Sequence, residues 1–474
     1  MEIGFRFFYL VNKSTLPENI FKANEYNSLT MKLEINKYPA HSNVKIIMYL
    51  IWPLLLALLS CSASENETLT FKEIRTPNRS ISPMISVWSN LQDTILSVKV
   101  DSLFRNHNRF PLVEIDSLYS DYLYVTFIYR DTSVNEEISF DIFGNYNDRS
   151  LGDKKLKRLK NTDLLYRTYY MPNDVCFSYR YIINDSAQNT SRVITDPLNE
   201  ERIPTGEKKD YSWSVLDLRQ NEEVWYIKKY NDIKSQLIEF NFTSSLLNNT
   251  RKIYVYLPEN YDKDKYPGYP VIYLFDSFIY LNRIEAPNVL DNLIREEKIE
   301  PMIAVLIDNP SSDSRNEELP LNFAFKDFVI NELLPHINKT WNVTDDPART
   351  IIGGMSYGGL AAAFISFYAD SIFGNVLSQS GSFWRDTYVE EPMATWPRSD
   401  WLINKFQTSD KKNIKLYLDW GLQEPLILNS NRKFVRILDK LGYDFKYVEF
   451  NGWHDWSNSR KTFPAGLLYL LGKE

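Results

Sequence analysis

The chain is poor in the residues that hold metal ions and form disulfides. Its 474 residues include only two cysteines, Cys61 and Cys176, and four histidines. The cysteines form no C-x-x-C pair, no H-E-x-x-H sequence occurs, and there is no glycine-rich phosphate loop. We therefore expect neither a metal ion nor a nucleotide cofactor.

Long basic stretches are also lacking. The formal net charge is −7, and nucleic-acid binding depends on clustered lysine and arginine, so a nucleic-acid partner is not expected. A hydrophobic content of 44%, with 15% aromatic residues, is sufficient for packed cores. The length has room for two domains.

The most informative segment is the pentapeptide Gly354–Gly358, with the sequence G-M-S-Y-G. A strand-like run, Arg349–Gly353, precedes it, and a run of small residues, Gly359–Ala363, follows. This is the strand–turn–helix context of a nucleophile elbow, in which glycines let the backbone bend and expose the serine hydroxyl. Ser356 is therefore predicted to be a nucleophile, and the N–H of Tyr357 to be one donor of its oxyanion hole.

A serine nucleophile needs a base. Only His454 follows Ser356, as the order nucleophile, acid, histidine of the α/β-hydrolases requires. It comes directly after the strand-like run Phe445–Glu449, in the loop where this fold presents its histidine. His336 lies instead in an apolar helical pattern, and we expect it to be structural.

The acid is expected after a strand between these two residues. The run Asn413–Asp419 has a strand pattern, and the loop Trp420–Pro425 follows it. Glu424 is favoured, because a side chain on the loop reaches the imidazole Nδ1 and fixes its tautomer. Asp419, still within the strand pattern, is the alternative.

The second oxyanion donor should come from the loop after an early buried strand. The apolar run Pro270–Phe275 is typical of a strand buried on both faces. Asp276, Ser277 and Phe278 follow it, and the N–H of Ser277 or of Phe278 is the candidate donor.

The order of elements predicts two domains. Strands alternate with helical stretches over residues 236–474, which indicates a mainly parallel sheet flanked by helices, an α/β-hydrolase domain. Residues 86–218 contain short alternating or aromatic-rich runs separated by turn clusters, which predict a small β-sandwich. Residues 219–235 are charged and polar, and are interpreted as a linker.

The run Ile46–Cys61 suggests targeting. It is apolar for about 15 residues, which suits a signal peptide better than a membrane span, and it ends in Leu58-Leu59-Ser60-Cys61, which resembles a bacterial lipobox. Residues 1–61 are interpreted as a presequence and lipoprotein signal, with translation starting at Met48, acylation at Cys61 and a tether over 62–85. The protein is then lipid-anchored in the periplasm or cell envelope. A buried helix, or a membrane anchor with Cys61 incidental, is the alternative.

Several blocks resemble the enterochelin (enterobactin) esterase family. The R-x-x-E-L-P-x-N stretch and the V-L-S-Q-S-G-S-aromatic-W block are more specific than G-x-S-x-G, since generic esterases need not carry them. The blocks in the carboxyl-terminal half are Arg315–Asn322, Gly354–Leu360, Val376–Trp384, Gly421–Pro425 and Gly452–Asp455. Weaker matches in the amino-terminal half are Val125–Arg130, Leu159–Asp163 and Thr195–Asn199.

The resemblance, which covers roughly residues 85–474, implies a substrate. The family hydrolyses the serine trilactone esters of catecholate siderophores and so allows iron to be released. Arg315 is then a candidate ligand for the anionic ferric catecholate, since a guanidinium suits clustered charged oxygens. A surface salt bridge to Glu317 or Glu318 is the alternative. Trp384 either stacks on an aromatic acyl group or fills the core.

Three functions compete. The leading hypothesis is a serine esterase acting on a ferric catecholate siderophore through Ser356, His454 and Glu424. The second is an esterase for feruloyl or acetyl groups on polysaccharide, with a glycan-binding sandwich. The third is a non-catalytic surface lipoprotein that binds siderophore or glycan, which has no need of a complete Ser/Glu/His set.

Overall fold

The computed structural model describes most of the chain after residue 81. The described residues are 82–106, 110–132, 138–144 (backbone only), 153–186, 188–204, 212–219, 225–230, 234–385 and 399–473. The predicted signal, the acylation site at Cys61 and most of the tether lie outside them, as does much of the predicted linker. Within the described ranges, no helix is both long enough and apolar enough to cross a membrane.

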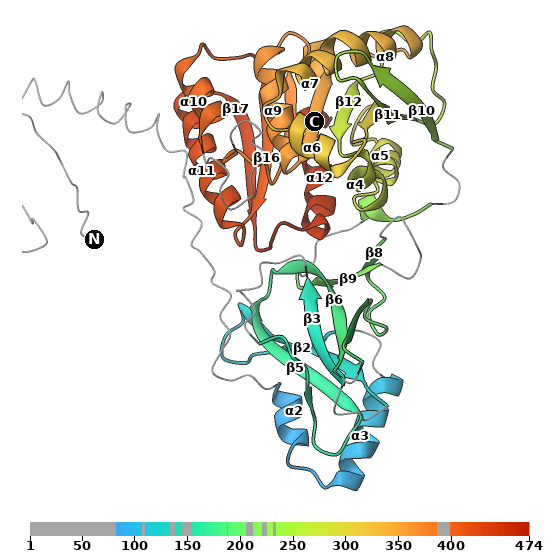
Figure 1. Cartoon of the computed structure of the whole chain (residues 1–474), viewed down its shortest axis with the longest axis vertical. Helices are drawn as coiled ribbons and strands as arrows, with labels where there is room; N and C mark the ends of the chain where they lie inside the picture. Colours follow the sequence, from blue (N-terminus) through green and yellow to red (C-terminus); the bar gives the residue numbers. More distant parts are fainter. Residues whose placement is uncertain are drawn as a thin grey trace, which may run out of the picture. The chain divides into compact units, whose positions relative to one another are not determined.

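The carboxyl-terminal half is built on an eight-stranded sheet (Figure 1). The first two strands in the order below pair antiparallel, the second pairs antiparallel with the third, and all later pairs are parallel. The predicted mainly parallel sheet is therefore confirmed. In spatial order the strands are β10 (Gln236–Ser244), β11 (Asn249–Leu257), β13 (Ile303–Ile307), β12 (Val271–Phe275), β14 (Thr350–Met355), β15 (Asn375–Gln379), β16 (Lys415–Gly421) and β17 (Asp444–Phe450).

Helices cover both faces of this sheet. Successive side chains of a strand point to opposite faces, and here both sets are apolar, so both faces must be buried. In β12, Val271, Tyr273 and Phe275 join one core, and Ile272 and Leu274 join the other. The first core is completed by α7 (Phe323–Phe328), α8 (Leu334–Thr340), α9 (Tyr357–Tyr368), α10 (Trp401–Thr408) and α11 (Pro425–Lys440). The second is completed by α4 (Ser277–Asn282), α5 (Ala286–Arg295) and α12 (Trp456–Leu471). The remaining short segments are α6 (Ser312–Glu318), η3 (Trp225–Ile227), η4 (Val329–Leu333) and η5 (Pro347–Arg349).

The amino-terminal part is a sandwich of two sheets, as predicted. One sheet has the order β1 (Leu112–Ile115), β2 (Tyr122–Arg130), β5 (Leu164–Pro172) and β4 (Lys157–Arg158). The other has the order β3 (Ile138–Gly144), β6 (Cys176–Asp185), β9 (Trp213–Asp217) and β8 (Arg202–Ile203), with β7 (Thr190–Ile194) beside β6. Their facing side chains share one aromatic core, in which Phe127 of β2 packs edge-on against Tyr179 of β6.

The start of this domain differs from the sequence prediction. Residues expected to be the end of a tether and the first part of the sandwich form two helices instead, α2 (Pro83–Trp88) and α3 (Asp93–Asn106). The buried residues of α3 are Leu96, Val100 and Leu103, whose spacing of four and three is helical rather than alternating. The β assignment from residue 86 was therefore wrong over this stretch.

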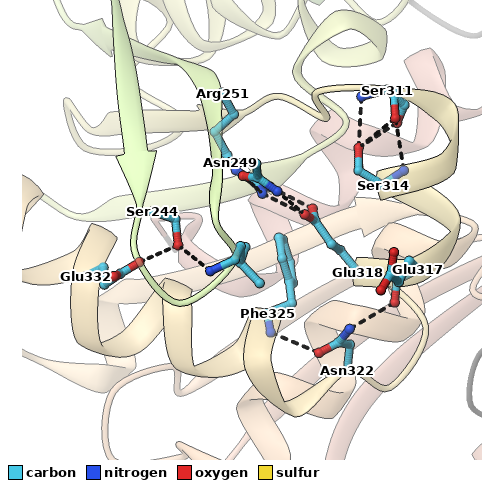
Figure 2. Close-up of polar contacts among 11 residues, drawn as sticks. Ser244, Asn249, Arg251, Ser311, Ser314, Glu317, Glu318, Asn322, Phe325 and Glu332 are labelled. Atoms are coloured by element: carbon cyan, nitrogen blue, oxygen red, sulfur yellow. Dashed lines mark hydrogen bonds and ion pairs between the residues drawn. The ribbon is translucent and has the colours of Figure 1, made fainter.

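Much of the Arg315–Asn322 block serves the fold (Figure 2). The carboxylate of Glu318 accepts hydrogen bonds from both terminal nitrogens of Arg251, at 2.9 Å each, and one from Asn249 at 2.7 Å. The Arg251 side chain is fully buried. Asn322 caps α7 by accepting a hydrogen bond from the N–H of Phe325 at 3.1 Å.

Replacing Glu318 with alanine is expected to destabilise the protein strongly. The change leaves the Arg251 charge buried without its carboxylate, which typically costs about 3–5 kcal/mol of unfolding free energy. Urea unfolding of wild type and Glu318→Ala measures the loss. Glu317→Ala removes the neighbouring, exposed carboxylate and should be close to neutral. Equal unfolding midpoints for all three proteins would contradict the assigned role.

Candidate active site

Ser356 lies at a sharp turn between β14 and α9. Its backbone has φ 60° and ψ −115°, a conformation that non-glycine residues rarely adopt. Every residue of β14 is buried, and so is nearly all of α9. The rigid elements on both sides therefore hold the strained turn, and the serine side chain stays partly exposed.

Glycine is required at position 354 because the strand end and the first helical turn touch. A Cβ built on Gly354 would lie 2.6 Å from the carbonyl carbon of Gly358, far inside van der Waals contact. A Cβ on Gly358 would contact Asp276, in the loop after β12. The elbow is thus packed directly against the predicted oxyanion loop.

The serine hydroxyl has a polar neighbour that the sequence reasoning did not identify. Its Oγ lies 3.2 Å from the Oγ of Ser382, and the N–H of Ser382 donates to the Ser356 carbonyl at 3.1 Å. The Ser356 N–H donates to the carbonyl of Gln379 at 2.8 Å. Among the described residues, the hydroxyl of Ser356 is hydrogen-bonded to Ser382 and not to His454.

His454 and Glu424 meet as the sequence suggested. Nδ1 of His454 lies 2.6 Å from Oε2 of Glu424. A carboxylate only accepts hydrogen bonds, so Nδ1 is the donor, and Nε2 is the acceptor in the neutral imidazole. The Glu424 side chain is buried, and its Oε1 accepts from the Gly421 N–H at 2.6 Å and the Ser380 hydroxyl at 2.9 Å. The hydrogen bonds to Oε1 thus fix the carboxylate, and Oε2 orients the imidazole.

Asp419, the alternative acid, lies elsewhere. It is fully buried within β16, where it accepts hydrogen bonds from the Ser380 N–H at 3.3 Å and the Gln379 amide at 3.4 Å. Burial raises the pKa of this carboxyl to about 7, against the lowering effect of its hydrogen bonds. It makes no hydrogen bond to His454 in the described structure, and Ser380 bridges it to Glu424.

The loop after β12, predicted to supply an oxyanion donor, is held by Arg315. Asp276 has a left-handed backbone with φ 59°, and its carboxylate accepts two hydrogen bonds from Arg315, at 2.6 and 2.7 Å. Burial lowers the pKa of Arg315, but the charge and hydrogen bonds of Asp276 outweigh this and leave it raised. The alternative prediction, a surface salt bridge from Arg315 to Glu317 or Glu318, was therefore wrong. The guanidinium also lies over the Tyr357 ring, 5.4 Å from its centroid.

The remaining predicted residues have clear positions. Ser277 is buried as the first residue of α4, where helical N–H groups lack an intrahelical acceptor, and its hydroxyl donates to Asp308 at 2.9 Å. Trp384 is partly buried and packs against the larger hydrolase core. His336 lies among aromatic side chains, 5.3 Å from the Phe240 ring. No cluster of metal-ligating side chains occurs in the described ranges.

In the block Val376–Trp384, the sequence analysis assigned a candidate role only to Trp384, but three other residues of the block contact the candidate site. Gln379 and Ser382 both hydrogen-bond to Ser356. Ser380 hydrogen-bonds to Glu424. Its polar residues within an apolar strand–loop segment were the available signal, because polar groups placed in a core need buried partners.

Two family models match the chain. A putative esterase family matches residues 244–470, and the enterochelin esterase N-terminal domain matches residues 124–225. An iron(III) enterobactin esterase of Dickeya dadantii is 27% identical over 409 residues, covering 76% of this chain and 90% of that protein. The protein of the same name from Escherichia coli K12 is 26% identical over 288 residues, covering 59% and 68%.

Solved structures share the fold. The ferric enterobactin esterase of Salmonella typhimurium superposes with a TM-score of 0.66 at 21% identity, covering 78% of this chain and 98% of that one. The enterobactin esterase of Shigella flexneri, in the presence of enterobactin, gives 0.66 at 23%, covering 78% and 97%. The protein is therefore an esterase of the α/β-hydrolase class. The two family models match separate parts of the chain, the enterochelin esterase N-terminal domain in the amino-terminal half and the putative esterase domain in the carboxyl-terminal half.

Proposed function

We propose that Ser356, His454 and Glu424 form the catalytic triad of an esterase that hydrolyses the serine trilactone of a catecholate siderophore and so allows iron to be released. The observation that carries the proposal is the 2.6 Å contact between His454 and a buried, fixed Glu424, beside a strained serine elbow. Ser356 attacks the ester carbonyl while His454 takes its proton. His454 then gives this proton to the leaving alcohol oxygen as the ester C–O bond breaks. Water, deprotonated by His454, hydrolyses the acyl-enzyme, and the proton returns to Ser356 as the acid product leaves.

Two backbone donors are proposed for the oxyanion. The N–H of Tyr357 follows the nucleophile, and the N–H of Ser277 opens α4 on the loop that touches the elbow. Substrate binding brings the hydroxyl of Ser356 from Ser382 to Nε2 of His454, since catalytic hydrogen bonds often tighten only in the complex.

The siderophore is favoured over a polysaccharide ester by the amino-terminal half of the chain. That half matches the enterochelin esterase N-terminal domain, and the match to the iron(III) enterobactin esterase of Dickeya dadantii covers 90% of that protein. A feruloyl esterase relative is 25% identical over 38% of this chain and 26% of its own length. The third hypothesis, a binding protein without activity, is not retained, because the chain is an esterase.

A substrate panel tests this function. Wild-type protein should hydrolyse an iron-loaded catecholate trilactone with a higher kcat/KM than a feruloylated oligosaccharide. Ser356→Ala should remove nearly all of this activity, on the order of 10⁴- to 10⁶-fold, and keep the fold. Product formation by chromatography and thermal melts provide the measurements. A folded Ser356→Ala protein with normal turnover would refute the mechanism, and a preference for the feruloyl ester would refute the substrate.

Arg315, which binds Asp276, is proposed to bind the anionic substrate at the same time. Asp276 takes the Nε and one Nη group, while about a quarter of the side chain, 24%, stays exposed beside the oxyanion loop. The third nitrogen remains for a charged ligand. Trp384, packed on the same domain and partly exposed, is proposed to stack on a catecholate ring.

Arg315→Ala should raise KM for the ferric catecholate by about 10- to 150-fold, as expected for a charge-assisted contact. Arg315→Lys keeps the charge but loses the two-pronged geometry, so it should recover part of the loss. A small neutral aryl ester should be affected much less. Measurement of kcat and KM for both substrates decides the matter. Equal losses on both would mean that Arg315 acts only by holding Asp276.

A lipid anchor at Cys61, in the periplasm or cell envelope, is also proposed. It rests on the lipobox-like sequence before Cys61 and the polar stretch after it. In a bacterial host the protein should incorporate labelled palmitate and sediment with membranes. Cys61→Ser should abolish the labelling, with Cys176→Ser as the matched control that keeps it. Unchanged labelling of Cys61→Ser would exclude this acylation site.

A further inference from the structure

The loop that carries His454 lies against the amino-terminal sandwich. Residues 451–455, here called the histidine loop, run beside the start of β6. Gly452 pairs with Cys176 as an isolated parallel bridge, and the Cys176 N–H donates to the Asn451 carbonyl at 3.4 Å. The Cys176 carbonyl accepts from the Asn458 amide at 3.1 Å. The loop therefore has a hydrogen-bonded partner strand that belongs to the other domain.

Both side chains that flank His454 are buried against the sandwich. Trp453 is 1% exposed, belongs to the sandwich core, and packs edge-on against Phe177 with ring centroids 5.1 Å apart. Asp455 is also 1% exposed. Its Oδ2 accepts from the N–H of Ser178 at 2.9 Å and from the Ser178 hydroxyl at 2.8 Å. Its Oδ1 accepts from the N–H and hydroxyl of Ser457, at 2.7 and 2.6 Å.

His454 itself is turned the other way. Its side chain is 39% exposed and reaches Glu424, which lies at the start of α11 in the hydrolase domain. Asp455 has an extended backbone, with φ −138° and ψ 135°. The backbone bends at His454, between the two buried neighbours. With Trp453 and Asp455 fixed in the sandwich on either side of the bend, the imidazole is held beside Glu424 in the hydrolase domain.

We infer that the sandwich completes the active site, and that Phe177 and Ser178 of β6 are positioning residues for His454. The inference rests on the proposed triad. Neither residue contacts the reacting atoms, and each acts by fixing a side chain adjacent to the histidine. The effect should be large, because a displacement of about 1 Å in a catalytic group costs up to about 100-fold in rate.

The neighbouring Cys176 has no separate chemistry in this arrangement. Burial raises the pKa of its thiol to about 12. A thiol that stays protonated is a poor nucleophile and metal ligand. Its Sγ contacts the Ser457 hydroxyl at 3.5 Å and its backbone pairs with the loop, so this stretch of β6 acts through packing and hydrogen bonds.

The test uses the full-length protein and a neutral aryl ester, so that siderophore binding does not enter. Ser178→Ala, which removes the hydroxyl donor to Asp455, should lower kcat by about 10- to 100-fold with little change in KM. Phe177→Leu, which loosens Trp453, should act in the same direction. Lys461→Gln is the control, since it breaks another contact between the sandwich and α12, the ion pair with Asp217. Lys461→Gln should lower the melting temperature, because it removes a contact between the domains, but it should leave kcat unchanged.

A double-mutant cycle separates positioning from a general loss of structure. In the His454→Ala background, Ser178→Ala should have almost no further effect, because its action passes through the missing imidazole. Equal losses with and without His454 would overturn the inference, as would a normal kcat for a folded Ser178→Ala or Phe177→Leu protein. Failure of the triad itself would be seen separately, as activity retained by Ser356→Ala.

Discussion

The site depends on one strained residue. Ser356 is held at φ 60° because a fully buried strand enters the turn and a nearly fully buried helix leaves it. Such a backbone conformation costs of order 1–3 kcal/mol and persists only where the surrounding packing determines it. The other groups of the site are arranged around this turn. Gln379 and Ser382 bind its backbone, and Asp276 lies against the helix start.

Two buried carboxylates near Ser356, those of Glu424 and Asp276, are each held by neighbouring hydrogen-bond donors. Glu424 is held by Gly421 and Ser380 before it meets His454. Asp276 is held by Arg315, whose guanidinium also faces the ring of Tyr357. Each carboxylate is neutralised or hydrogen-bonded locally, so the hydrolase core tolerates these charges close to Ser356. Preorganised groups of this kind need little rearrangement when charge develops on a substrate.

What could be predicted from the sequence was local. Chain order suggested Ser356 and His454 as nucleophile and base. The position of Glu424 beyond a strand favoured it over Asp419, and Glu424 is the carboxylate that contacts His454. Contacts between distant segments could not be predicted in the same way. Arg315 pairs with Asp276, 39 positions away, rather than with the adjacent glutamates, and Ser178 meets Asp455 across 277 positions. The helix α3 was missed because its buried residues, Leu96, Val100 and Leu103, were read within a β-rich region.

The pairing of Cys176 with Gly452 also bears on how the protein is made. Ribosomes deliver β6 long before the histidine loop, and domains generally fold in the order of their synthesis. The sandwich is therefore expected to be folded by the time the last strand of the sheet is synthesised. Under the proposed mechanism, the nascent chain has its serine nucleophile, but its histidine base is not held in place until Trp453 and Asp455 pack against the sandwich. Activity then requires the final segment of the polypeptide, and the elbow alone is inactive.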